Sequence, residues 1–235
     1  MQAQFVGAPD AFAALTRLVA QYRAESRADP VGLELEARIG RVASGTGVSA
    51  EEIDRMTKFV QTNPLLTVRE WTQHTDYFLE WEGREYRYRT TGDGDTLRLT
   101  TEVTRKVRLG ACTLHSGTAA VRFALSREVP VDVATLPETL VPKHVRITHR
   151  KAFEFASRGF AARPTWRIDF GIVWSGDTKL EAETRQREYR VSQYTAELEL
   201  LDPAYVVAHD DAYVACSLAM KVSDLFEREA HFVRA

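Results

Sequence analysis

The chain has 235 residues, of which 44% are hydrophobic and 27% charged, and its formal net charge is -2. No stretch is long and apolar enough to span a membrane, and the composition is that of an ordinary globular protein. The near-neutral balance argues against a protein that grips a long nucleic acid over a broad basic surface, so any basic site must be local and offset by acidic residues.

The N-terminal region and the two cysteines indicate the compartment. Charged residues from Asp10 to Glu25 interrupt what would have to be the apolar part of a signal peptide. Cys112 and Cys216 fit no metal-binding or redox spacing, so we interpret them as free thiols in a reducing compartment. We therefore expect an intracellular protein, cytoplasmic or nuclear, that does not act at a membrane.

Helices are predicted at both ends of the chain. The first covers about residues 10–26 and has apolar side chains at helical spacing, namely Phe12, Leu15, Leu18, Val19 and Tyr22. A second is predicted to begin at Ser49, with Glu52 three residues on to complete a capping box, and to end before Pro64. The last covers about residues 212–230.

From about residue 67 to residue 200, with Glu181 in a loop, the pattern is almost wholly that of strands in an antiparallel barrel or sandwich, and we place the β core at about residues 31–203. Short runs rich in Val, Thr, Tyr and Phe alternate with Gly, Asp or Pro breaks. Gly92-Asp93-Gly94-Asp95 is the clearest hairpin turn; it also resembles the start of a calcium loop, but the remaining ligands of such a loop are absent. We find no repeat or linker and predict one α+β, mainly β domain over residues 1–235.

Two strands carry glutamates on one face only. Glu34 and Glu36 alternate with apolar residues, and Glu197 and Glu199 do the same near the other end of the β region. Either strand alone could be half-buried with a solvated outer face. Barrel closure would instead make them neighbours, and four converging carboxylates would repel one another unless a cation lay among them. Oxygen-only ligation suits Mg²⁺ or Mn²⁺, and the sequence does not distinguish the two.

Several other predicted strands carry basic and polar residues at alternate positions, and therefore on one face. These sets are Arg87 and Arg89; Arg98, Thr100, Glu102, Thr104, Lys106 and Arg108; Arg146, Thr148 and Arg150; and Arg167 with Asp169. Each is an ordinary solvent-facing strand by default. If the terminal helices cover the apolar face of the sheet, however, the charged face must point inward. A closed barrel lined by Arg, Lys and Glu would accommodate a polyphosphate with its metal.

Other catalytic motifs are absent from the sequence. There is no Walker A loop, no GxSxG, no HExxH and no KxDG nucleotidyltransferase motif. His149 neighbours Arg150, but its parity directs it to the apolar face and favours a structural role.

The acidic and basic strand segments, taken in their order along the chain, resemble those of the triphosphate tunnel metalloenzymes. They resemble most closely the metal-dependent RNA 5′-triphosphatases of fungal and viral mRNA capping. The resemblance covers about residues 33–203 and rests on LELEARIG (33–40), YRTT (88–91), TRKVR (104–108), VRFALSREVPV (121–131), VRITHRKAF (145–153), WRIDFGIV (166–173) and AELELLDP (196–203). It implies a closed antiparallel barrel of about eight strands with a charged interior and flanking helices.

The resemblance also implies roles for individual residues. Direct metal ligands would be Glu34, Glu36 and Glu199, with Glu197 contacting the metal through water. The γ-phosphate would be bound by Arg89 and Arg150, with Lys106 on the phosphate path. Glu128 would position or activate the attacking water, and Arg167 and Asp169 would form a supporting ion pair. The implied partner is a 5′-triphosphate RNA end, and any guanylyltransferase must reside on a separate chain or domain.

Two positions depart from the capping pattern. Thr148 stands where the family usually has lysine, and Thr195 where it usually has glutamate. Three hypotheses remain open: an RNA 5′-triphosphatase, a tripolyphosphatase or small organic triphosphatase of the same fold, and a module that binds triphosphate ends without cleaving them. Arg38 closes the first glutamate motif where the tripolyphosphatase branch typically carries lysine, which favours the capping branch. The oligomeric state and source, cellular or viral, are not indicated by the sequence.

Overall fold

The structure is a computed structural model that describes residues 9–41, 47–93, 96–116, 119–137, 139–155 and 163–232. Its strands are β1 (Leu33–Arg41), β2 (Thr67–Val68), β3 (Thr72–Trp81), β4 (Arg84–Asp93), β5 (Thr96–Ser116), β6 (Ala119–Pro130), β7 (His144–Phe155), β8 (Trp166–Gly176) and β9 (Gln193–Leu200). Its α-helices are α1 (Pro9–Ala28), α2 (Ala50–Gln61), α3 (Lys179–Arg187), α4 (Pro203–Ala208) and α5 (Asp211–Phe232), and a 3₁₀ turn covers Val133–Thr135.

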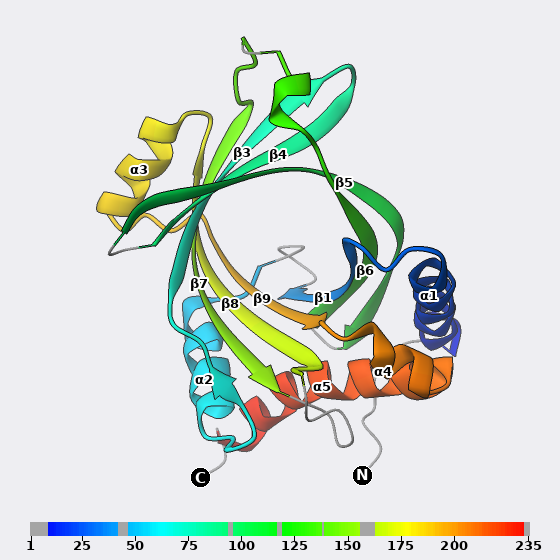
Figure 1. Cartoon of the computed structure of the whole chain (residues 1–235). Helices are drawn as coiled ribbons and strands as arrows, with labels where there is room; N and C mark the ends of the chain where they lie inside the picture. Colours follow the sequence, from blue (N-terminus) through cyan, green and yellow to red (C-terminus); the bar gives the residue numbers. More distant parts are fainter. Residues whose placement is uncertain are drawn as a thin grey trace.

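Eight of these strands form a closed antiparallel barrel (Figure 1). The hydrogen-bonded order is β7-β3-β4-β5-β6-β1-β9-β8, and β8 pairs with β7 to close the circle. The short strand β2 pairs with β7 outside this circle. Closure satisfies the edges that an open sheet would leave unpaired. The predicted fold class, a closed barrel of about eight strands with helices at both termini, is therefore confirmed.

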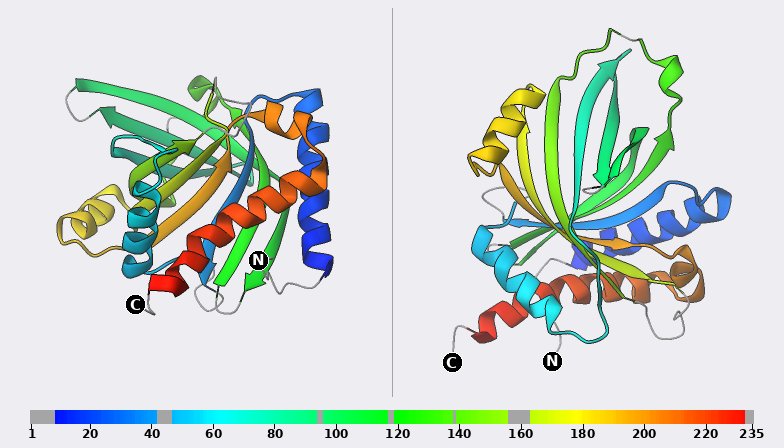
Figure 2. Two further views of the ribbon diagram at one scale, coloured as in Figure 1. Left: turned by 90° about the horizontal axis from the view of Figure 1, so that it is seen from below. Right: turned by 60° about the vertical axis from the view of Figure 1, so that its left-hand side comes forward.

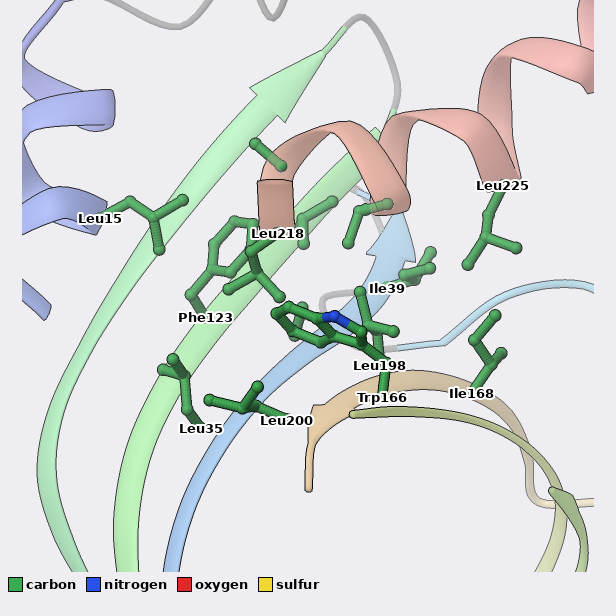
Figure 3. Packing of buried hydrophobic residues seen from close by; sticks show 14 of the residues in the cluster. Leu15, Leu35, Ile39, Phe123, Trp166, Ile168, Leu198, Leu200, Leu218 and Leu225 are labelled. Atoms are coloured by element: carbon green, nitrogen blue, oxygen red, sulfur yellow. The ribbon is translucent and has the colours of Figure 1, made fainter. Parts of the chain in front are cut away.

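The apolar core lies outside the barrel. Leu35, Ala37 and Ile39 of β1 are fully buried, and they pack with apolar residues of β6, β8 and β9 beneath the helices (Figure 3). From α1, the residues Leu15, Leu18, Val19 and Tyr22 join this core, whereas Phe12 remains 39% exposed. Because the apolar face of each strand turns outward, the polar face must line the interior.

Helices α1, α2, α4 and α5 cover this outer face together (Figures 1 and 2). An ion pair between Arg23 Nε and Asp211 Oδ1, 2.8 Å apart, joins α1 to α5. Arg127, on the outer face of β6, binds Glu25 and Asp29 at the C-terminal end of α1, at 3.1 and 3.0 Å. These contacts fix the helical layer over the barrel wall that contains β1. None of the described helices is long and apolar enough to cross a membrane.

The N-terminus of α2 has the predicted capping box. The Ser49 side chain accepts a hydrogen bond from the Glu52 amide at 3.2 Å, and the Glu52 carboxylate accepts one from the Ser49 amide at 2.6 Å. We expect Ser49→Ala to lower the free energy of unfolding by about 1 kcal/mol, because an amide of the first turn loses its acceptor. Chemical denaturation would measure this. Ser49→Asp should retain most of the stability, and an equal loss in both variants would contradict the capping role.

Helix α3 was not predicted. The region 67–200 was interpreted as almost wholly strand, and Glu181 as a loop residue, but Glu181 lies in α3, outside the barrel. Only Ala182 of this helix is buried, in a small second core with Val145, Ile147 and Trp174, so the helix lacks the apolar stripe that reveals an amphipathic helix.

Two smaller expectations concern the turn after β4 and the cysteines. Strands β4 and β5 pair as an antiparallel hairpin, but Gly94 and Asp95 of the predicted turn lie outside the described residues, as do the side chains of Arg98 and Thr100. Cys112 and Cys216 are both free thiols, as predicted.

Candidate functional site

The barrel interior is a cavity of about 520 Å³ whose wall is mostly charged. All of the residues that the sequence singled out for metal or phosphate chemistry line it: Glu34, Glu36, Arg89, Lys106, Glu128, Arg150, Arg167, Asp169, Glu197 and Glu199. These residues lie on β1 and on β4 to β9. Along each of these strands, period-2 alternation turns the charged side chains inward and their neighbours outward.

The two glutamate strands are direct neighbours. Strand β1 pairs with β9 in a register that sets Glu36 opposite Glu199 and Arg38 opposite Glu197. The expected adjacency of the two acidic strands is therefore confirmed. The barrel topology produces it, because the first and last strands of the chain lie side by side in the circle.

Basic side chains neutralise this cluster. Lys106 Nζ lies 2.8 Å from Glu34 Oε2 and 3.6 Å from Glu36 Oε1. Arg38 pairs with Glu197 at 2.8 Å, and the Arg167 Nη2 group lies 2.5 Å from Glu199 Oε2. Burial lowers the pKa of Lys106, but the charges of Glu36 and Glu34 outweigh it and raise the pKa above its usual value.

Burial keeps Glu197 and Glu199 costly to ionise despite these cations. Burial raises the pKa of Glu199 to about 7, against the opposing charge of Arg167, and Glu34 adds to the rise. Burial likewise raises the pKa of Glu197, which Arg38 partly opposes. A divalent cation would lower the pKa of these two carboxyl groups, because it stabilises their ionised form.

The donor set fits such a cation by chemistry. Four carboxylates on adjacent strands supply only oxygen, which Mg²⁺ and Mn²⁺ prefer. As the side chains stand, no three His, Cys, Asp or Glu groups among the described residues converge as a metal site. The carboxylates are engaged by Lys106, Arg38 and Arg167, so metal binding would require these cations to move off their partners.

A second cluster surrounds Asp76 of β3, which is 2% exposed. Arg89 donates two hydrogen bonds to its carboxylate, from Nε at 2.6 Å and from Nη2 at 2.9 Å. His74 Nε2 lies 3.6 Å from the same group. Burial alone would raise the pKa of Asp76, but His74 and Arg89 hold it well below its usual range. Asp76 is thus a fixed anion that orients Arg89 in the cavity wall.

Arg150 is held more loosely. Its Nη1 lies 3.6 Å from Asp169 Oδ2, beyond hydrogen-bond distance, and its buried Nε has no hydrogen-bond partner in the described part of the chain. Arg167 takes the closer place beside Asp169, donating from Nε at 2.8 Å, so the expected ion pair between these two is present. An anion in the cavity could satisfy the free donor of Arg150.

Glu128 lies on the wall formed by β5 and β6. Its carboxylate accepts a hydrogen bond from Arg87 Nη2 at 2.6 Å, and Lys106 is its register partner. Its main chain abuts the turn before β1, where Gly32 has φ +66° and its carbonyl accepts from the Glu128 amide at 2.8 Å. A Cβ at residue 32 would lie 2.1 Å from the Glu128 carbonyl oxygen, so only glycine permits this approach.

Known structures share this architecture. The S. pombe Pct1 RNA triphosphatase superposes with a TM-score of 0.62 at 15% sequence identity, covering 96% of this chain and 93% of that one. The Mimivirus capping enzyme triphosphatase gives a TM-score of 0.57 at 14% identity, covering 90% and 96%. The chain has the fold of these RNA triphosphatases. No family model and no curated protein matches the sequence itself.

Part of this wall was not predicted from the sequence. Strand β3 turns His74, Asp76 and Phe78 inward, and none of them was singled out. The available signal was the period-2 placement of His74 and Asp76 ahead of an apolar run. It was weak because a polar residue on a half-buried strand ordinarily faces solvent. Arg87 was noted only for its parity, yet it is the group that holds Glu128.

The two departures from the capping pattern are neighbours in space. A Cβ on Gly171 of β8 would lie 2.5 Å from Thr195 Oγ1 and 3.6 Å from Thr148 Cγ2, so the two threonines flank the same glycine. A lysine at 148 and a glutamate at 195 would therefore sit on adjoining parts of the wall. Because lysine and glutamate carry opposite charges, the two threonines leave the net charge of this part of the wall the same as that pair would.

His149 does not line the cavity. Its ring stacks on Trp71 with centroids 4.3 Å apart, on the outside of the barrel, and burial lowers its pKa. Its placement on the outer face agrees with the parity of the strand.

Proposed function

We propose that this chain is a metal-dependent RNA 5′-triphosphatase, which hydrolyses the γ-phosphate of triphosphate-ended RNA and leaves a diphosphate end. The observation that carries the proposal is a closed tunnel in which a four-carboxylate cluster on β1 and β9 faces arginines on β4 and β7. The likeness to the two RNA triphosphatase folds supports it.

The side chains divide the work by charge. Arg89, oriented by Asp76, and Arg150, with its free Nε, bind the γ-phosphate oxygens and stabilise their charge as the bond to the leaving oxygen breaks. Lys106 lies along the path of the phosphates and balances part of their negative charge. Glu128 accepts a hydrogen bond from the attacking water and aligns it with phosphorus, while Arg87 fixes the Glu128 carboxylate.

A divalent Mg²⁺ or Mn²⁺ ion would be held by Glu34, Glu36 and Glu199, with Glu197 in support, and would supply Lewis-acid stabilisation of the phosphate charge. Release of that metal should abolish turnover. We expect γ-phosphate release from end-labelled triphosphate RNA with Mg²⁺ or Mn²⁺ and none with chelator.

The same assay separates the other functions that the fold permits. Faster turnover of tripolyphosphate or a nucleoside triphosphate than of RNA would indicate a small-molecule triphosphatase. A folded protein that binds triphosphate RNA but releases no phosphate with either metal would contradict hydrolysis and indicate a binding module. The buried carboxylate cluster favours an enzyme, because a pure binder of anions gains nothing from acidic groups in its site.

A further inference from the structure

The charged groups of the tunnel are not evenly mixed. Glu34 and Glu36 occupy the first part of β1, and Glu199 pairs with Glu36. Arg38 comes next along β1, and its partner in β6 is Arg122. The lining therefore changes from acidic to basic along β1.

Arg108 of β5 is a further cation of the cavity wall near Arg122. It pairs with Ser126 of β6, next to the bulge between Arg108 and Gly110, and it lies close enough to Arg122 to act on its charge. Burial lowers the pKa of Arg122, and the charges of Arg108 and Arg38 lower it further. Two neighbouring guanidinium groups thus oppose the charge of Arg122 in the cavity wall.

These cations are poorly matched within the protein. Arg38 pairs with Glu197, but Arg108 and Arg122 form no hydrogen bond or ion pair with any residue that the structure describes. Arg146 of β7, which also lines the cavity, contacts the Phe78 ring at 5.0 Å, and the charge of Arg38 acts on it as well. A cluster of this kind costs stability and is explained if an external anion completes it.

The size of the anion follows from the rest of the tunnel. A free triphosphate carries its charge on three phosphates, which Arg89, Arg150 and Lys106 can already match. Arg122 lies opposite Arg38, which follows Glu36 in the inward-facing series of β1, and Arg108 lies opposite Ser126 on the neighbouring strand. Further phosphates that follow the triphosphate, as they do in a nucleic acid strand, would supply the negative charge that these two arginines lack.

We propose that Arg108 and Arg122 form a second anion subsite that binds the phosphodiester backbone next to the 5′-triphosphate. This subsite makes the enzyme select polynucleotide ends over free triphosphates. The inference rests on the proposed function, because it takes the triphosphate to lie among the carboxylates and Arg89. Arginine suits the role, since its planar donors pair with phosphate oxygens two at a time.

The test compares an Arg108→Gln/Arg122→Gln double variant with wild type and with Arg105→Gln. Arg105 is on the same strand as Arg108 but does not line the cavity. Binding of a fluorescent ten-nucleotide 5′-triphosphate RNA is measured by anisotropy, in chelator to prevent turnover, at several salt concentrations. Inorganic tripolyphosphate is measured as the competitor.

We expect the double variant to bind the RNA about tenfold more weakly, with a loss at least fivefold larger than that for tripolyphosphate. The slope of log affinity against log salt should fall by about 1.4, or about 0.7 for each lost contact with a single strand. Arg105→Gln should change neither quantity. In turnover with metal, the loss should appear in KM for RNA.

Equal losses for RNA and tripolyphosphate, or an unchanged salt slope, would overturn the subsite. A lower melting temperature in the double variant would also overturn it, because removing mutually repelling charges should not destabilise the fold. Arg108→Lys/Arg122→Lys keeps both charges and should keep the salt slope. The binding measurement does not depend on catalysis. If the wild-type protein is inactive but shows the expected preference for RNA, the proposed hydrolysis is wrong and the proposed subsite is supported.

Discussion

Replacing Glu34 or Glu199 by alanine is expected to lower γ-phosphate release by about 10²-fold or more. Both carboxylates lie in the cluster that would hold the metal, and charge stabilisation in an enclosed site is worth at least this much. Metal affinity should fall with turnover, so Mn²⁺ titration calorimetry on the same variants provides a second measurement that does not depend on catalysis.

Two controls make this result specific. Glu181→Ala removes a half-exposed carboxylate of α3 that binds Arg185 of its own helix and the Asp177 amide in the turn before it, and should leave turnover near normal. Glu34→Gln keeps the side-chain volume beside Lys106 and should lose activity as Glu34→Ala does. Near-normal rates in both Glu34→Ala and Glu199→Ala would refute the metal assignment, and a large loss in Glu181→Ala would mean that the site lies elsewhere.

The barrel was predictable because alternation and element order constrain it together. Glu34 and Glu36 alternate with apolar residues that need cover, and the terminal helices supply that cover from outside. Once the apolar face is outward, the charged residues of every strand must share one interior. Closure then brings β1 beside β9, although some 160 residues separate Glu36 from Glu199 along the chain.

Side-chain partnerships were not predictable from the same pattern. Parity places Lys106 and Glu34 inside, but only the register and strand tilt bring the Lys106 amine within 2.8 Å of the carboxylate. Similarly, the sequence shows Thr148 and Thr195 only as two separate departures from the capping pattern. The structure brings both threonines next to Gly171.

Substitution of Asp76 is expected to have the second large effect on turnover. Its buried carboxylate accepts both hydrogen bonds that orient Arg89. We expect Asp76→Asn to lower turnover by about 10²-fold, because an amide can accept only one of these bonds and a misplaced phosphate-binding group is costly at this level. Asp76→Ala should also destabilise the fold, by less than the roughly 3 to 5 kcal/mol of a fully buried pair, since Arg89 faces the cavity and can be hydrated.

If Asp76 acts only by positioning Arg89, the two residues must be coupled. The loss of turnover in the Asp76→Asn/Arg89→Ala double variant should then equal the loss in Arg89→Ala alone, because the guanidinium that Asp76 orients is absent from both. Glu80→Gln provides the matched control: Glu80 lies on the same strand and pairs with Lys143, but both are exposed and the pair contributes little. If the losses of turnover in the two single variants instead add up in the double variant, Asp76 has a role of its own. Its carboxylate, which lies close to His74 in the tunnel wall, would then contact the substrate or the attacking water directly.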